Sequence, residues 1–300
     1  QPRRQRQMCI RDRLVFVGLW SSAFVTAKVG VEYATPFAML LTRFALVSCL
    51  FGSLFLIARY WRRIVLKTAG MATIALTALV GLLLHGVYLG SVFFALSVGL
   101  SAGLSALIVS LQPLLASGLA IFLFGERLSA AQIVGMVAGI SGVFLVLLPK
   151  MDGAMPMLGL LSVSIGLVAV TSGTLLQKKI GGKIDLLPSN VIQSLAASAF
   201  FVIICSTVET PRISWEMPFM LALGWQVIMV SAGAYVILMV MIRRDTMAAV
   251  SSLMFLVPPV TAVIAAVGFD EPLTPVSILG FCVTSAGVYL VTRYSSPGTP

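Results

Sequence analysis

Charged side chains are scarce in this sequence. They make up 10% of its 300 residues, whereas 59% of the residues are hydrophobic. Soluble domains carry about a quarter charged residues, so this composition excludes a soluble globular fold. The few charges cluster and leave apolar runs of roughly 20 residues, the length of a helix that crosses ~30 Å of hydrocarbon. The runs do not alternate apolar and polar residues, which disfavours a β-barrel. We therefore predict an all-α integral membrane protein.

Residues that bind metals or perform covalent catalysis are also few. The chain has one histidine, His85, and four cysteines whose spacing fits neither a metal site nor a disulfide framework. No P-loop, HExxH or dinucleotide-binding pattern is present. We therefore expect no metal, no cofactor and no enzymatic activity.

The apolar runs predict ten transmembrane helices. Prolines stand at many of the proposed helix boundaries, where they are least costly. We place the helices at residues 14–32, 37–58, 70–94, 101–124, 131–148, 157–177, 188–208, 218–241, 247–267 and 275–292.

The net charge of +10 is explained by the loops between these helices. Basic residues gather in the cytosolic loops of membrane proteins, so their distribution indicates orientation rather than nucleic-acid binding. The odd-numbered connections contain only Lys150 and Arg212. The even-numbered connections and the C-terminal tail contain Arg59, Arg62, Arg63, Lys67, Arg127, Lys178, Lys179, Lys183, Arg243, Arg244 and Arg293. We therefore expect a multi-pass protein of the cell (inner) membrane with both termini in the cytosol.

The sequence repeats itself at an offset of 145 residues. Phe124-Gly125-Glu126-Arg127-Leu128 recurs as Phe269-Asp270-Glu271-Pro272-Leu273, and Pro113 and Pro258 have the same spacing. Five spans per copy is an odd number, so the second copy must cross the membrane in the opposite direction. Inverted repeats of this kind are typical of secondary transporters, in which two similar halves alternately open a central site.

These boundaries divide the chain into five parts. We expect a non-native or disordered leader at residues 1–13, a first five-helix repeat at 14–148, a linker at 149–156, a second five-helix repeat at 157–292 and a cytosolic tail at 293–300.

Several motifs resemble those of the EamA-type drug/metabolite transporters. In the first copy they are Leu19-Trp20-Ser21-Ser22-Ala23-Phe24 with Lys28, Pro36 and Arg43, then His85-Gly86-Val87-Tyr88, Leu111-Gln112-Pro113-Leu114 and Gly125-Glu126-Arg127-Leu128. In the second copy they are Pro258, Glu271, Leu273 and Gly280. The resemblance covers residues 14–292. It implies a ten-helix bundle of two inverted five-helix repeats, and secondary transport, often export, of amino acids, related metabolites or drugs.

His85 is the first candidate for the substrate pathway. Thr77, Gly81, His85 and Tyr88 are spaced 4, 4 and 3 residues apart, which predicts a polar stripe along one helix face. A polar stripe within the membrane suits a cavity wall. His85 could then bind substrate or carry a proton, since histidine titrates near neutral pH. The alternative is a hydrogen bond between helices.

Prolines within two spans suggest hinges. Gln112 precedes Pro113, and the corresponding positions in the second copy lead into Pro258 and Pro259. A proline within a membrane helix frees carbonyl groups for a ligand or a neighbouring helix. We therefore predict hinges or broken helices at these prolines, and a substrate contact at Gln112.

Two cations and three aromatic residues complete the candidate pathway. Arg43 could bind a substrate carboxylate, and Lys28 lies near the outer end of the first span. The alternative for both is snorkelling to the headgroups. Trp20, Phe24 and Tyr235 are candidates for the cavity wall, although such aromatics more often pack. We expect Glu126 and Glu271 to stabilise the N-termini of the helices that follow them.

Together these features predict a secondary active transporter that exports small metabolites such as amino acids or amphipathic compounds. Its partners would be a small-molecule substrate and membrane lipid, without nucleic acid. A coupling proton or ion and a homodimer stay open at this stage. So do an importer or a lipid-intermediate flippase of the same fold, and, outside transport, a membrane-embedded enzyme or a sensor.

Overall fold

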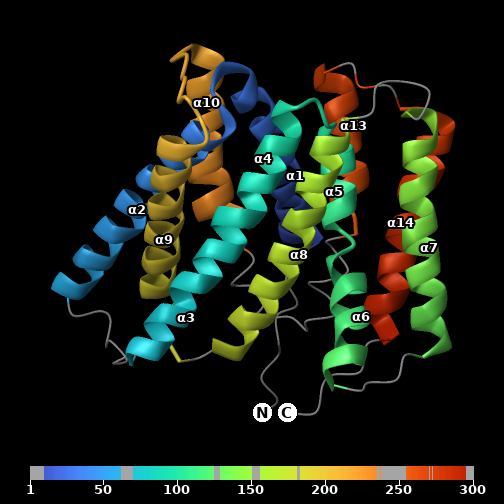
Figure 1. Cartoon of the computed structure of the whole chain (residues 1–300), viewed down its shortest axis with the longest axis horizontal. Helices are drawn as coiled ribbons and strands as arrows, with labels where there is room; N and C mark the ends of the chain where they lie inside the picture. The colour runs from blue at the N-terminus through green and yellow to red at the C-terminus, as the bar shows by residue number, and fades with distance from the viewer. Residues whose placement is uncertain are drawn as a thin grey trace. The chain divides into compact units, whose positions relative to one another are not determined.

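The computed structural model describes residues 10–61, 70–124, 129–150, 156–180, 183–234, 237, 255–269, 271 and 273–294. The chain forms two compact units, and each unit takes helices from both halves of the sequence (Figure 1). Unit 1 contains Gln1–Thr26, Leu100–Met157 and Ile228–Pro300, and unit 2 contains Ala27–Gly99 and Leu158–Val227.

Helices account for almost all of the described residues. They are α1 (Ile10–Tyr33), α2 (Pro36–Tyr60), α3 (Met71–Gly81), η1 (Leu82–Val87), α4 (Tyr88–Ser97), α5 (Ala102–Val109), α6 (Gln112–Phe124), α7 (Ala130–Leu147), η2 (Leu148–Lys150), α8 (Met157–Ile180), α9 (Leu186–Thr207), α10 (Met217–Trp225), η3 (Gln226–Ala234), α13 (Val257–Phe269) and α14 (Pro275–Tyr294). Nine helical stretches within the described ranges are long and apolar enough to cross a membrane, and α13 is a shorter apolar helix at the ninth predicted span. The predicted fold class, ten transmembrane helices in two inverted repeats, is confirmed.

Four of the expected helices differ in detail. Helix α1 begins at Ile10, so residues 10–13, which we had assigned to the leader, are helical. The third span continues to Ser97 and contains a π-helical turn, η1, and the eighth changes from α10 into the π-helical η3. The fourth span is interrupted at residues 110–111, between α5 and α6. Of the ninth predicted span, residues 247–254 lie outside the described part of the chain.

In unit 1, α7 and α14 pack against each other through glycines. A Cβ atom placed on Gly135 would lie 2.7 Å from the carbonyl oxygen of Gly287, and one on Gly142 would lie 2.6 Å from that of Gly280. The backbones therefore approach so closely that no side chain fits between them. Close approach at small residues is how helices associate in lipid, where water-driven burial is absent.

These contacts are reciprocal between the two repeats. At the offset of 145 residues, Gly135 corresponds to Gly280 and Gly142 to Gly287, so each contact occurs together with its symmetric equivalent. Between them Thr284 Oγ1 donates a hydrogen bond to the carbonyl oxygen of its own counterpart, Gly139, at 3.3 Å. Residue numbers rise along α7 as they fall along α14, so these equivalent helices are antiparallel. That is the geometry of an inverted repeat.

In unit 2, α2 and α9 form a second antiparallel pair of equivalent helices, side by side in Figure 1. Ser48 Oγ lies 3.4 Å from the Oγ of Ser198, 150 residues further along the chain. The loop after α9 also caps α2, because the Glu209 carboxylate accepts hydrogen bonds from the backbone N–H groups of Phe37 and Ala38, at 3.3 and 2.9 Å. An isolated β-bridge between Ala34 and Ile213 joins the same two loops.

The glycine contacts of α7 and α14 can be tested by adding one methyl group. We expect Gly142→Ala to destabilise the protein by roughly 1–3 kcal/mol, because the new Cβ would meet backbone atoms of α14, which cannot rotate away. The measurement is the melting temperature in detergent. Gly18→Ala on α1 is the matched control, since a Cβ there has no neighbour within 4 Å. Equal melting temperatures for the two variants would contradict this packing argument.

Candidate functional site

Three of the predicted pathway residues come together in unit 2. Arg43 of α2 is buried, with 5% of its surface exposed. It lies close enough to His85 of η1 and Tyr88 of α4 to interact electrostatically with both. A cation from the second span, and an imidazole and a phenol from the third span, therefore form one polar cluster.

A fourth member of this cluster was not among the predicted site residues. Gln193 of α9 is 1% exposed, and its side chain is hydrogen-bonded to His85. Its Nε2 donates to Gln177 Oε1 of α8 at 3.0 Å and to Ser189 Oγ at 2.9 Å. Gln193 is the counterpart of Arg43 at an offset of 150 residues. The equivalence of these two positions was the sequence signal that could have identified Gln193. To use it, one would have had to know that α2 packs against α9.

Aromatic rings border the cluster on one side. The Phe44 ring lies 5.2 Å from the His85 ring and 6.1 Å from the Phe201 ring, and the Arg43 guanidinium lies 5.5 Å from the centre of the Phe44 ring. Phe200 packs edge-on against Phe201 at 5.2 Å. A cationic and hydrogen-bonding group beside aromatic surface can bind a small molecule that has both a carboxylate and an apolar part.

The π-helical turn changes the predicted polar stripe. Thr77 and Gly81 lie in α3, where α-helical spacing holds, but His85 lies within η1 and Tyr88 follows it. The spacing of 4, 4 and 3 residues therefore does not describe one continuous α-helical face. Thr77 Oγ1 donates to the carbonyl oxygen of Thr73 at 2.7 Å, within its own helix. The contacts of His85 and Tyr88 follow from η1 and its neighbours instead.

The remaining predicted pathway residues lie elsewhere. Lys28 is half-buried on the part of α1 that belongs to unit 2. Trp20, Phe24 and Gln112 belong to unit 1, where Phe24 is buried and the Trp20 ring packs 5.4 Å from that of Phe16. Tyr235 lies outside the described residues. The substrate-pathway role of all eight residues stays a prediction.

The helical stretch is interrupted near Pro113, and a neighbouring helix uses a carbonyl group close to Pro259. Residues 110–111 interrupt the span immediately before Gln112. Pro259 has no N–H to offer the carbonyl group of Phe255, four residues earlier, and Ser285 Oγ of α14 donates to that oxygen at 2.9 Å. Nearby, Ser21 Oγ of α1 donates to the carbonyl oxygen of Val257 at 3.3 Å. Neighbouring helices therefore use these carbonyl groups, and the hinge role of Pro113, Pro258 and Pro259 stays a prediction.

Because Ser285 donates to the carbonyl group that Pro259 cannot serve, we predict that substitutions at these two residues have non-additive effects on the free energy of unfolding. We expect Ser285→Ala to destabilise the protein by about 0.5–1.5 kcal/mol, because it leaves the Phe255 carbonyl group without its donor. In a Pro259→Ala background the same substitution should cost less, since the restored N–H can serve that carbonyl. Unfolding of the four variants in detergent measures the difference. Equal costs of Ser285→Ala in both backgrounds would contradict it.

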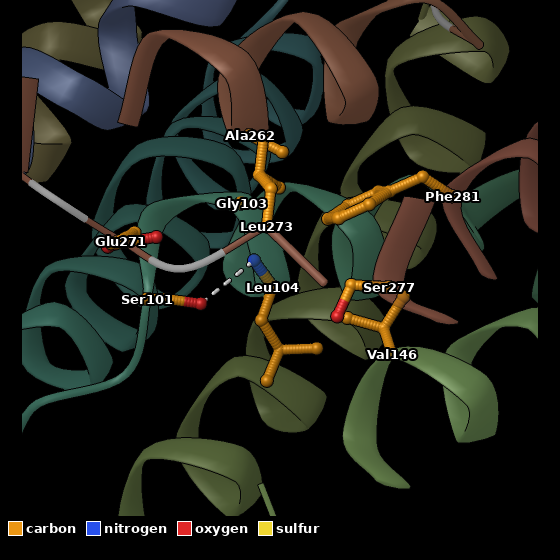
Figure 2. A pocket seen from close by; sticks show the side chains of 9 residues that line it. All are labelled: Ser101, Gly103, Leu104, Val146, Ala262, Glu271, Leu273, Ser277 and Phe281. Carbon is orange, nitrogen blue, oxygen red and sulfur yellow. Dashed lines mark hydrogen bonds between the residues drawn. The ribbon is translucent and has the colours of Figure 1, made fainter. Parts of the chain in front are cut away.

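A small pocket lies in unit 1, where α5 meets the loop that precedes α14 (Figure 2). Its lining includes Ser101, Glu271, Ser277 and Phe281, and it has room for about one or two water molecules. None of the predicted pathway residues lines it. The pocket is therefore distinct from the polar cluster of unit 2.

Glu271 serves a different helix from the one expected. Its Oε1 accepts a hydrogen bond from the backbone N–H of Ala102, at the N-terminus of α5, at 3.4 Å. The following helix, α14, is capped by Thr274, whose Oγ1 accepts from the N–H of Ser277 at 3.1 Å. The tertiary fold therefore places the Glu271 carboxylate at the N-terminus of α5, and its expected effect on α14 stays a prediction. Glu126 lies outside the described residues.

The described residues contain no group of three or more histidine, cysteine, aspartate or glutamate side chains that could hold a metal ion. The polar cluster is a cationic and hydrogen-bonding site. The Arg43 guanidinium and the Tyr88 hydroxyl carry donors that suit an anionic or zwitterionic group.

Comparison with known proteins gives consistent results. The profile of the EamA-like transporter family matches residues 14–148 and again residues 157–293. A "Probable amino-acid metabolite efflux pump" of Escherichia coli (strain K12) is 27% identical over 289 residues, which cover 92% of both chains. The "Uncharacterized transporter YvbV" of Bacillus subtilis (strain 168) is 26% identical over 197 residues, and this match spans 65% of each chain. A solved crystal structure shares the fold with a TM-score of 0.62 at 18% identity, and the match covers 95% of this chain and 98% of that chain.

Proposed function

This chain belongs to the EamA-like transporter family, and on that basis we propose that it is a secondary active transporter that exports small metabolites, such as amino acids or amphipathic compounds. It is a multi-pass membrane protein whose family moves small molecules across membranes. Beyond this family function, we propose the direction of transport, the substrate class and the mechanism. It assigns no enzymatic activity.

The observation that carries the mechanism is the reciprocal packing of equivalent helices. Helices α7 and α14 in unit 1, and α2 and α9 in unit 2, pair each repeat with its inverted copy. Two conformations of such a protein can have nearly equal free energies, because each repeat can adopt the arrangement that the other repeat leaves. Alternating access follows if the exchange exposes a bound substrate first to the cytosol and then to the outside.

The polar cluster of unit 2 supports the substrate class. The buried Arg43 guanidinium suits a carboxylate, and His85 and Tyr88 add hydrogen-bonding groups beside it. The neighbouring Phe44 and Phe201 rings suit an apolar side chain. The Escherichia coli relative is named for amino-acid metabolite efflux, which agrees with this chemistry.

Transport assays test the proposal directly. Purified protein in liposomes should move labelled amino acids in a saturable manner, and a pH gradient across the membrane should alter the rate if a proton is the coupling ion. We expect Arg43→Gln, His85→Ala and Gln112→Ala to reduce the flux at least several-fold while expression is retained, because each removes a proposed substrate contact.

Cys282→Ala is the matched control, since Cys282 is exposed on α14 and belongs to no proposed contact. If all three pathway variants transport at the wild-type rate, these residues pack within the bundle and do not contact the substrate. Absence of flux for every member of a broad metabolite panel would contradict export of small metabolites.

We propose that the protein lies in the inner membrane with both termini in the cytosol. This orientation predicts that two exposed loop positions face opposite sides of the membrane. In a variant without native cysteines, Glu216→Cys should react with a membrane-impermeant maleimide on intact cells. Lys183→Cys should react only after the membrane is permeabilised. Both side chains are exposed on unit 2, so burial does not confuse the comparison, and the reverse pattern would invert the topology.

A further inference from the structure

Both repeats contain a π-helical segment at the same place. At an offset of 147 residues, which aligns Tyr88 with Tyr235 in the sequence, the segment η1 (Leu82–Val87) corresponds to residues 229–234, and these lie within the described part of η3 (Gln226–Ala234). At this offset the counterpart of His85 is Ala232. The π-helical turn therefore belongs to the common architecture of the repeats, and only the first repeat places a histidine in it.

A π-helical turn decides which way the side chains within it point. It contains more residues per turn than an α-helix, and each residue of an α-helix advances about 100° around the axis. One additional residue in the turn thus redirects everything after it by about that angle. In this chain the redirected residue His85 meets α9 and α2, through Gln193 and Phe44.

The backbone around η1 is fixed by close contacts with two helices. A Cβ atom on Gly81 would lie 2.5 Å from the Cα atom and 2.6 Å from the carbonyl oxygen of Gln193. A Cβ atom on Gly173 of α8 would lie 2.6 Å from the Leu84 side chain. The third span therefore has little freedom to rotate against α8 and α9. The backbone of Gln193 lies against Gly81, about one helical turn before His85.

The Gln193 amide is itself oriented by its neighbours. A primary amide has two N–H donors and one carbonyl acceptor. Nε2 donates to Gln177 Oε1 and Ser189 Oγ, which accounts for both donors. The side-chain oxygen is then the atom that faces the imidazole, so His85 is the donor in their hydrogen bond.

We infer that Gln193 is a positioning residue for His85: its side-chain oxygen, held in place by Gln177 and Ser189, fixes one orientation of the imidazole ring that the π-helical turn presents to α9. This inference rests on the proposed function only for its consequence in transport. In that setting Gln193 sets the nitrogen atom that His85 offers to a substrate, and it need not touch the substrate itself.

The single histidine of the chain makes the inference directly measurable. Protein labelled with ¹⁵N-histidine and purified through a tag without histidine gives ring nitrogen signals from His85 alone. We expect one ordered set of signals in the unaltered protein. Gln193→Leu should replace it by shifted or multiple signals, because the acceptor is gone. Gln193→Glu keeps an acceptor oxygen and should restore a single set.

Gln132→Leu is the matched control, since Gln132 is a buried glutamine that caps α7 in unit 1, whereas His85 belongs to unit 2. It should leave the His85 signals unchanged. Unchanged signals in a folded Gln193→Leu protein would overturn the inference, as would a shift of equal size in Gln132→Leu.

Transport rates separate this inference from the proposed function. We expect Gln193→Leu to slow transport up to about tenfold, the scale of one lost hydrogen bond, and Gln193→Glu to recover part of that loss. If the His85 signals respond to Gln193→Leu while His85→Ala transports normally, Gln193 positions His85 but His85 is not in the pathway. That result would sink the proposed role of His85 in transport and leave the positioning role intact.

Discussion

Helices inside a membrane associate mainly through close backbone packing and hydrogen bonds between helices. Lipid tails are as apolar as leucine side chains, so burying leucine between helices brings no advantage, and small residues decide the contact. In this protein Gly135 and Gly142 of α7 meet Gly287 and Gly280 of α14 at distances that exclude a Cβ atom. Because the two helices are equivalent and antiparallel, a single glycine spacing in the ancestral repeat provides both sides of the interface.

The span count and the inverted duplication could be predicted from the sequence because both depend on local properties. Span length follows from hydrocarbon thickness, and helix breaks follow from proline chemistry. The break before Gln112 and the carbonyl of Phe255 released by Pro259 belong to this class. They require no knowledge of which helices are neighbours.

The features that were missed all depend on neighbours. The π-helical turn around His85 has no unusual residue pattern of its own, and it is held by the approach of Gly81 to Gln193 and of Gly173 to Leu84. Gln193 resembles any polar residue in a span until α8 and η1 are placed beside it. Glu271 was assigned to the next helix in sequence, as caps usually are, but tertiary folding brings it to α5. In each case the contact, and not the residue type, carries the information.

The two repeats share their packing but not their polar groups. Arg43 corresponds to Gln193, and His85 corresponds to Ala232, whereas Gly135 and Gly142 of α7 correspond to Gly280 and Gly287 of α14. An inverted pair needs matching backbones so that either copy can adopt either conformation. A substrate, by contrast, has different chemical groups at its two ends, and a symmetric binding site would recognise them poorly. Divergence of the polar residues on a shared backbone arrangement therefore meets the requirement of the transporter that we propose: a symmetric exchange of conformations around an asymmetric site.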